Sequence, residues 1–250
     1  MLERKKLLFL IFLLLSFFIP PFTTVSVPAE ESSLVIRDVL IQTSVAFLWF
    51  SPVVHIAVVI LFIALFQFGS RVGKIADGFF GFLFIFLAIS NHVAVTENYG
   101  FTVIIGNLIP ILIVGLFWLW ECLKPQNEYD FQRLPLWRYW VIPFAFLSFW
   151  SPINVDLSPN FSPLLLLTSQ FGVMYCATTP VIIALLTLIY PHVNKFLLLV
   201  TSLVGFIMGL FNAISLFTMP GYTLWNFILH IPLILLSIYG LLITRIIKNN

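Results

Sequence analysis

Residues 195–219 read KFLLLVTSLVGFIMGLFNAISLFTM, a lysine followed by a long run without another charged residue. A helix needs about 20 predominantly apolar residues to cross the hydrocarbon core of a bilayer. Within the run Thr201, Gly205, Gly209 and Ala213 recur every four residues, so small side chains line one face and allow a second helix to approach closely. This stretch therefore predicts a membrane-spanning helix that packs within a bundle.

The composition extends this prediction to the whole chain. Of its 250 residues, 61% are hydrophobic and 9% are charged, whereas a soluble domain has about 45–50% apolar and 25% charged residues. We expect a single integral membrane domain over residues 1–250, with the lipid bilayer as its main partner. The net charge is only +2 and no basic residues cluster densely, which argues against a nucleic-acid partner.

Eight stretches are apolar enough, or nearly so, to span the membrane. They lack the alternation of a membrane barrel, so we predict an all-α, polytopic transmembrane helix bundle. The fifth stretch is short, and the sixth is interrupted by TTP at 178–180. Residues 32–50 are expected to form an interfacial helix or an extension of the second span. The eight predicted spans cover residues 7–25, 46–68, 76–95, 101–123, 137–152, 164–190, 195–219 and 223–245.

The distribution of basic residues predicts the orientation, because lysine and arginine in short loops stay in the cytoplasm. With eight spans and a cytoplasmic N-terminus, every one of the 12 lysines and arginines except Arg37 falls on the cytoplasmic side. The C-terminus is then cytoplasmic too, and we expect a multi-pass protein of the cell membrane. Asp77 and Glu121 are expected to form interfacial ion pairs, Asp77 with Arg71 or Lys74 and Glu121 beside Lys124.

The first span has two interpretations. Residues 7–25 follow the basic start MLERKK and precede VPA at 27–29, which fits either a retained signal-anchor or a cleaved signal peptide. Cleavage would leave seven spans and would not change the later helices.

Two parts of the chain resemble each other. FLAIS at 86–90 matches FNAIS at 211–215, and NLIPILIVGLFWL at 107–119 matches LHIPLILLSIYGLL at 229–242. These matches suggest parallel internal repeat units over 46–123 and 137–245. Repeats of this kind are common in transporters, where sites lie between the copies.

Polar residues inside the spans are the candidate ligand-binding residues, because polar groups are costly in lipid. Asn226 and His230 lie one helical turn apart before Pro232, whose ring leaves a backbone carbonyl without its usual donor. Asn107 and Pro110 occupy a comparable position in the other repeat unit. Gln170 and Tyr175 belong to a polar cluster before Pro180 in the sixth span. Packing contacts between helices are the competing explanation for all of them.

Three histidines are candidate metal or haem ligands: His55, His92 and His230. Two histidines that face each other across a bundle can hold haem b. None of the three pairs with another at ligand spacing on one helix, so hydrogen-bonded packing is the alternative role.

No motif of a metalloprotease, serine hydrolase, P-loop or dinucleotide-binding enzyme occurs, and nothing supports an enzyme. The sequence favours a permease-like membrane protein with a weakly polar small-molecule site between the repeats. The alternative is a membrane subunit of a larger complex, either non-catalytic or redox-active with b-haem or quinone.

Overall fold

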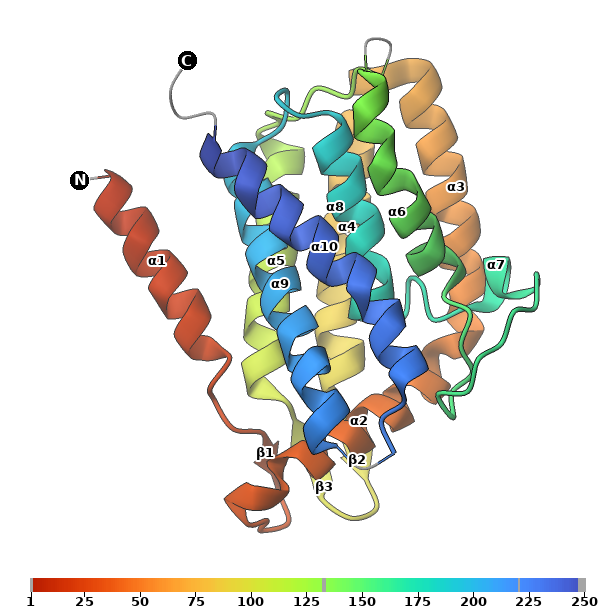
Figure 1. The fold of residues 1–250 in the computed structure, drawn as a ribbon. Helices are drawn as coiled ribbons and strands as arrows, with labels where there is room; N and C mark the ends of the chain where they lie inside the picture. Colours follow the sequence, from red (N-terminus) through yellow and green to blue (C-terminus); the bar gives the residue numbers. More distant parts are fainter. Residues whose placement is uncertain (1, 132–133, 220, 247–250) are drawn as a thin grey trace.

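The computed structural model describes residues 2–131, 134–219 and 221–246, and over these residues the protein is mainly helical (Figure 1). A small antiparallel sheet and several short 3₁₀ turns complete it. The helices are α1 (Leu2–Ser16), α2 (Ser32–Phe47), α3 (Ser51–Phe68), α4 (Gly73–His92), α5 (Ile105–Leu123), α6 (Val141–Trp150), α7 (Leu165–Thr168), α8 (Tyr175–Leu188), α9 (Lys195–Thr218) and α10 (Leu224–Ile246).

Within the described residues, five helical stretches are long and apolar enough to cross a membrane: Ser32–Arg71, Gly73–His92, Ile105–Leu123, Lys195–Thr218 and Leu224–Thr244. The helices at the other three predicted spans are shorter. The 14 residues of α8 rise only about 21 Å, less than the roughly 30 Å of a hydrocarbon core. The predicted sixth span is also interrupted before α8, at residues 169–174, and α8 continues through Pro180.

The two ends of the bundle differ in charge. One end of the bundle holds the start of α1, the turn between α3 and α4, the ends of α5 and α8, the start of α9 and the end of α10 (Figure 1). We call it the basic end. The sheet, α2 and the loop between α9 and α10 lie at the other, the acidic end, which carries Glu30, Glu31, Asp38, Glu97 and Asp156. Arg133 and Lys248 lie outside the described residues. The described basic residues at or near the basic end are Arg4, Lys5, Lys6, Arg71, Lys74, Lys124, Arg138, Lys195 and Arg245.

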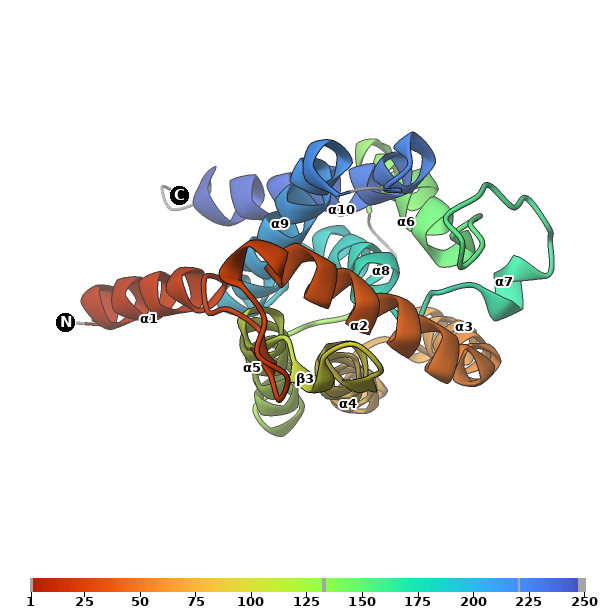
Figure 2. The same ribbon diagram turned by 90° about the horizontal axis from the view of Figure 1, so that it is seen from below.

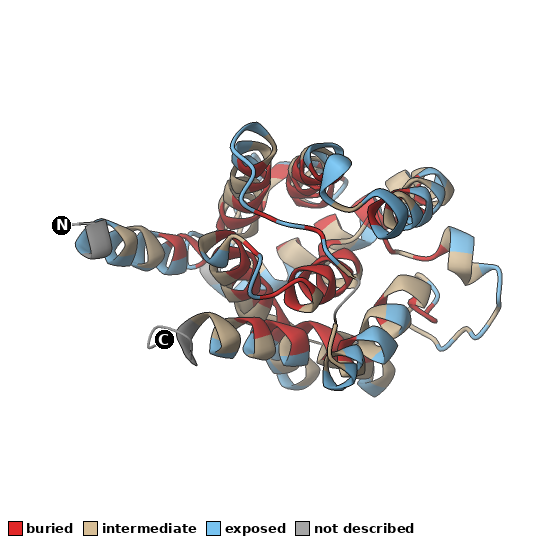
Figure 3. Ribbon diagram, turned by 90° about the horizontal axis from the view of Figure 1, so that it is seen from above, coloured by how far each residue is buried: buried red, intermediate tan, exposed pale blue. Residues whose placement is uncertain are grey.

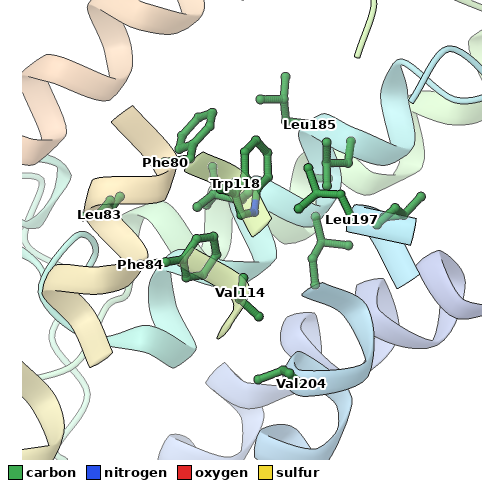
Figure 4. Close-up of a cluster of buried hydrophobic side chains, with 14 of the residues drawn as sticks. Phe80, Leu83, Phe84, Val114, Trp118, Leu185, Leu197 and Val204 are labelled. Carbon is green, nitrogen blue, oxygen red and sulfur yellow. The ribbon is translucent and has the colours of Figure 1, made fainter. Parts of the chain in front are cut away.

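Helix α8 lies at the centre of the bundle (Figure 2). Every residue from Thr178 to Thr187 is buried, and α8 packs against α4, α6, α9 and α10. Phe80, Phe84 and Trp118 from α4 and α5 fill the core beside it, together with Leu197 and Val204 from α9 (Figure 4). The short α8 is thus surrounded by protein rather than by lipid.

Small residues set the closest helix contacts. A methyl group added at Gly115 of α5 would lie 3.0 Å from the backbone nitrogen of Ile85 in α4. In the pair formed by α9 and α10, a methyl group at Gly205 would lie 2.6 Å from Ser237 Oγ, and one at Gly240 would lie 2.2 Å from Ser202 Oγ. The backbones of α4 and α5 therefore approach each other closely, and in the α9–α10 hairpin small glycine and serine residues face each other, as expected of helix contacts in membranes.

The outward faces of the helices are exposed (Figure 3), and many of the exposed side chains are large and apolar. Phe66, Phe82, Leu116 and Phe217 are each more than half exposed. In water such a surface would aggregate, so the molecule is built to be surrounded by lipid.

The all-α prediction needs one correction. Strands β1 (Phe22–Thr23), β2 (Val93–Thr96) and β3 (Gly100–Val103) form an antiparallel sheet in the order β1-β3-β2. β-branched residues favour strands, and Gly100 has a φ of 66°, which suits the tight hairpin that joins β2 to β3. Each strand has at most four residues, which is too short for the alternation of apolar and polar residues to reveal a strand in the sequence.

The predicted ion pairs of Asp77 and Glu121 are wrong. Both carboxylates are fully buried. Asp77 Oδ1 accepts hydrogen bonds from Tyr129 Oη at 2.5 Å and from Asn127 Nδ2 at 3.2 Å. Glu121 accepts from the backbone of Gln126 and Asn127 and from the side chain of Asn194. The segment after α5 folds back over both acids, so neutral donors rather than lysine or arginine bind them.

Candidate functional site

A cavity of about 400 Å³ lies at the acidic end, between α2 and the helices of the bundle. This volume is within the range of about 300–1,000 Å³ that is usual for small-molecule sites. Its walls come from α2, the ends of α4, α6 and α9, and the starts of α5, α8 and α10. Figure 2 shows α2 crossing this end of the bundle, so this helix forms a roof over the cavity.

The roof follows from the pattern of residues in α2. Ser33, Ile36, Arg37, Leu40, Ile41 and Ser44 all line the cavity, and their spacing places them on one face of a helix. An adjoining stripe, Val35, Val39 and Thr43, is buried against α4 and β2. The segment 32–50 is therefore a separate helix followed by a 3₁₀ turn, Leu48–Phe50, that leads into α3. Figure 1 shows α2 at an angle to α3, so the segment is a bent rather than a straight continuation into the second predicted span.

The five predicted ligand-binding residues all line this cavity: Asn107, Gln170, Tyr175, Asn226 and His230. They come from α5, the segment before α8, α8 and α10. The side-chain amides of Asn107, Gln170 and Asn226 form no hydrogen bond to any residue that the structure describes. Amides in an apolar setting need partners, so three separate elements present free donors and acceptors to one space.

Tyr175 contributes differently from the amides. Its ring packs against Phe84 with 6.0 Å between the centroids, and its hydroxyl is buried without a partner among the described residues. Its backbone N–H donates to Asn91 Oδ1 at 3.0 Å. Tyr175 thus lies mainly in the core and borders the cavity only in part.

Two asparagines that were not predicted also belong to the site. Asn91 Nδ2 donates to the carbonyl of Val173 at 2.6 Å, which fixes the irregular segment before α8. Asn212 Nδ2 donates to the carbonyl of Met208 at 2.9 Å, and its Oδ1 accepts from Tyr222 Oη at 3.2 Å. Burial raises the pKa of the Tyr222 phenol, so this group stays protonated as a donor. Met208, Asn212 and Ser215 lie on one face of α9 and all line the cavity. This helical spacing is the sequence signal that could have identified Asn212 as a residue of the site.

The candidate haem ligands divide between two places. His92 and His230 line the cavity, and the Nδ1 of each lies within 3.0 Å of a carbonyl one turn earlier, that of Ala88 or Asn226. A proton on Nδ1 would leave Nε2 as the free acceptor. His55 lies elsewhere: its Nε2 contacts Ser169 Oγ at 3.1 Å, and its ring lies between Phe149 and Phe171. Within the described ranges, no group of three or more His, Cys, Asp or Glu side chains is placed to bind a metal ion.

Charge in the cavity comes from one residue. Arg37 on α2 lines it, and none of its described lining residues is a carboxylate or a lysine. The remaining polar groups are amides, hydroxyls, imidazoles and the thiol of Cys176. The buried hydroxyl of Ser148 has no partner among the described residues.

A second hollow of about 420 Å³ lies between α3, α6 and α8. Apart from the phenol of Tyr139, its described lining side chains are all apolar, among them Val59, Phe62, Phe146 and Val181. With so few polar groups it has little means to orient a ligand, so the cavity beneath α2 is the candidate site. Comparisons of the chain with protein-family models, with curated proteins and with solved structures found no match.

Proposed function

We propose that this chain is a permease-like, multi-pass protein of the cell membrane that binds a small, weakly polar molecule beneath α2. The observation that carries the proposal is the convergence of three unpaired amides, Asn107, Gln170 and Asn226, on one cavity. Asn107, Gln170 and Asn226 are only partly buried, and they line the cavity from three different elements. A ligand in the cavity could hydrogen-bond to these amides, while the apolar walls would cover the rest of its surface.

The position of the cavity supports transport over a purely structural role. Its walls come from both proposed repeat units, 46–123 and 137–245, and the paired hairpins α4–α5 and α9–α10 flank it. Sites between repeats suit alternating access, in which one unit rocks against the other. We infer that the basic end is cytoplasmic, so the cavity beneath α2 opens toward the opposite side of the membrane.

The native thiol of Cys176 provides a direct test, because it lines the cavity. In a Cys122→Ala background, a membrane-impermeant thiol reagent is added to sealed vesicles of either orientation. A permease exposes its site to each side in turn, so we expect Cys176 to react from both sides. Reaction from one side alone would contradict transport and would favour a subunit or scaffold.

Two single-cysteine variants, both in a Cys122→Ala, Cys176→Ala background, serve as controls for this experiment. Asp156→Cys at the acidic end and Lys124→Cys at the basic end should each react from one side only, and from opposite sides. If each control variant reacted in vesicles of either orientation, the vesicles would be leaky, and the labelling of Cys176 would have to be repeated in sealed vesicles.

The second candidate function is a haem-binding membrane subunit, favoured by the two histidines that share the cavity. His92 and His230 would supply their Nε2 atoms, and bound haem would supply one-electron chemistry. The test is the visible absorption spectrum after reconstitution with haemin. A Soret band that His92→Ala or His230→Ala abolishes, and that His55→Ala leaves intact, supports this candidate. A protein that takes up no haemin excludes it.

A further inference from the structure

We propose that the molecule bound beneath α2 is an amphiphile with a single acidic head group, and that Arg37 binds this head group. The inference rests on the proposed function, because it concerns the same cavity. It specifies the ligand as an anion with an apolar body rather than as a neutral molecule.

The surroundings of Arg37 carry the proposal. The side chain is half-buried in the cavity wall, and its Nη2 lies near Gly221 in the loop between α9 and α10. Among the described residues it forms no hydrogen bond and no ion pair. Its neighbour Asp38 accepts instead from Asn98 Nδ2 at 3.4 Å, on the side of the β2–β3 turn. A guanidinium has five donors in a fixed fork that suits a carboxylate or a phosphate.

The position of Arg37 in the chain is the second observation. Every other basic residue that the structure describes lies at or near the basic end, and Arg37 alone lies at the acidic end. Anchoring α2 to the membrane surface does not require a positive charge, so this role does not explain an arginine at this position. A partly buried arginine without a counter-ion is costly unless an anion joins it, so the free guanidinium indicates an anion supplied by the ligand.

The acidic residues at the same end do not provide this anion. Glu30, Glu31, Glu97 and Asp156 are exposed and do not line the cavity. Charges in water are screened over about 8 Å at physiological ionic strength, so their repulsion of an anion is weaker than a direct contact with Arg37. They would slow the approach of an anion from solution more than they would weaken its binding.

The remaining walls suit an apolar body. Ile36 and Leu40 on α2 lie one turn apart on the lining face that carries Arg37, and Met208, Phe211 and Leu229 line the cavity from α9 and α10. A ligand with its acidic group at Arg37 can therefore place a chain or ring among these side chains. The amides of Asn107 and Asn226 would bind a polar substituent or water along it.

The experiment uses the full chain in a neutral detergent at neutral pH and measures binding by native mass spectrometry. The probes are dodecanoate and dodecanol, which differ in head group but not in chain length. We expect wild type to bind dodecanoate at least about tenfold more tightly than dodecanol, since hydrogen bonds to charged groups are the stronger ones. Arg37→Gln should remove this difference by weakening the binding of dodecanoate without changing that of dodecanol. Arg37→Lys should retain part of the preference for dodecanoate.

Asp38→Asn is the matched control, because it changes the charge of the adjacent residue outside the cavity; its affinity for dodecanoate should be no weaker than that of wild type. The inference is overturned if wild type binds no dodecanoate, or if Arg37→Gln binds it as tightly as wild type does. If either result occurs while Cys176 still reacts from both sides of the membrane, only the anion is rejected. If Cys176 reacts from one side alone, the proposed transport fails independently of Arg37.

Discussion

Asn91 fixes the irregular segment that leads into α8. Its amide donates to the Val173 carbonyl and accepts from the Tyr175 N–H, and only 1% of the residue is exposed. Without it, both backbone groups would be buried and unpaired. The orientation of Gln170 and Cys176 toward the cavity therefore depends on a residue that belongs to another helix.

Replacing Asn91 by alanine should lower the free energy of unfolding by about 1–3 kcal/mol, the cost of leaving buried polar groups unpaired. Thermal unfolding in detergent, followed by tryptophan fluorescence, measures the change. Asn98→Ala is the control, because Asn98 is exposed and its bond to Asp38 is long. A stability of Asn91→Ala equal to that of the control would show that the segment before α8 holds its shape without this residue.

Tyr129 covers the buried carboxylate of Asp77 at the basic end. Burial, reinforced by the nearby Asp77, raises the pKa of the Tyr129 phenol well above its ordinary value of 10.0. The folded protein therefore retains this proton at a pH where the unfolded chain loses it, and stability must fall as the pH rises above 10. Below that pH the contribution is fully present.

Tyr129→Phe removes this titration along with the hydrogen bond to Asp77. The variant should be less stable than wild type by about 1.5–3 kcal/mol near neutral pH. Above pH 10, however, the stability of the variant should fall less steeply than that of wild type, and the difference in slope should approach about 1.4 kcal/mol per pH unit. Unfolding temperatures of both proteins across this range test the slope, and parallel curves would contradict the prediction.

At the scale of elements, the contact between α4 and α5 depends on the absence of side chains. A methyl group at Gly115 would meet the backbone of Ile85 at 3.0 Å and the carbonyl oxygen of Gly81 at 3.1 Å. Neither backbone atom can move unless the helices separate. At Gly78 of the same pair, the nearest atom would be Cys122 Sγ at 3.2 Å, the end of a side chain that can rotate.

Gly115→Ala should therefore cost about 1–3 kcal/mol of stability through overpacking. Gly78→Ala is the matched control and should be neutral or slightly stabilising, because alanine is a better helix former than glycine by about 1 kcal/mol. Both are measured by thermal unfolding in detergent. Equal stabilities of the two variants would contradict the close contact between α4 and α5 at Gly115.

The N-terminal segment is part of the same fold. Phe17 lines the cavity, β1 pairs with β3, and the backbone N–H groups of Thr24 and Val25 donate to the carbonyls of Phe101 and Tyr99. Removal of residues 1–29 would leave β3 with an unpaired edge. We expect the purified protein to retain the segment, which an intact mass measurement decides. Ala29→Trp, which blocks the cleavage site, should change the mass only by the substitution.

At the scale of the whole molecule, the separation of charge between the two ends predicts its orientation. In a background without Cys122 and Cys176, Arg71→Cys and Lys124→Cys should react with an impermeant maleimide from the cytoplasmic side. Asp156→Cys should react from the opposite side. Reaction of the first two from different sides of an intact cell would contradict the arrangement of every helix between them.

The long helices α3, α4, α5, α9 and α10 could be predicted because each is encoded by a local, nearly unbroken apolar run. The irregular segment 169–174 could not, since Gly172 has a φ of 80° and the partners of the segment, Asn91 and Thr178, become visible only after folding. Asn107 and Asn226 were recognisable as polar residues within apolar runs. In the sequence Arg37 stands out only as an exception in charge, because the crossing of α2 over the bundle depends on tertiary contacts.

The pairing of β1 with β3 has a consequence for biogenesis. Residues 22–23 leave the ribosome well before residues 102–103, with two long hydrophobic segments made in between. Until then β1 lacks its partner strand, and the exposed Leu8, Phe12 and Leu15 of α1 suit contact with lipid. The sheet can close only after the nascent chain has returned to the acidic end of the bundle, so its closure follows the synthesis of both α3 and α4.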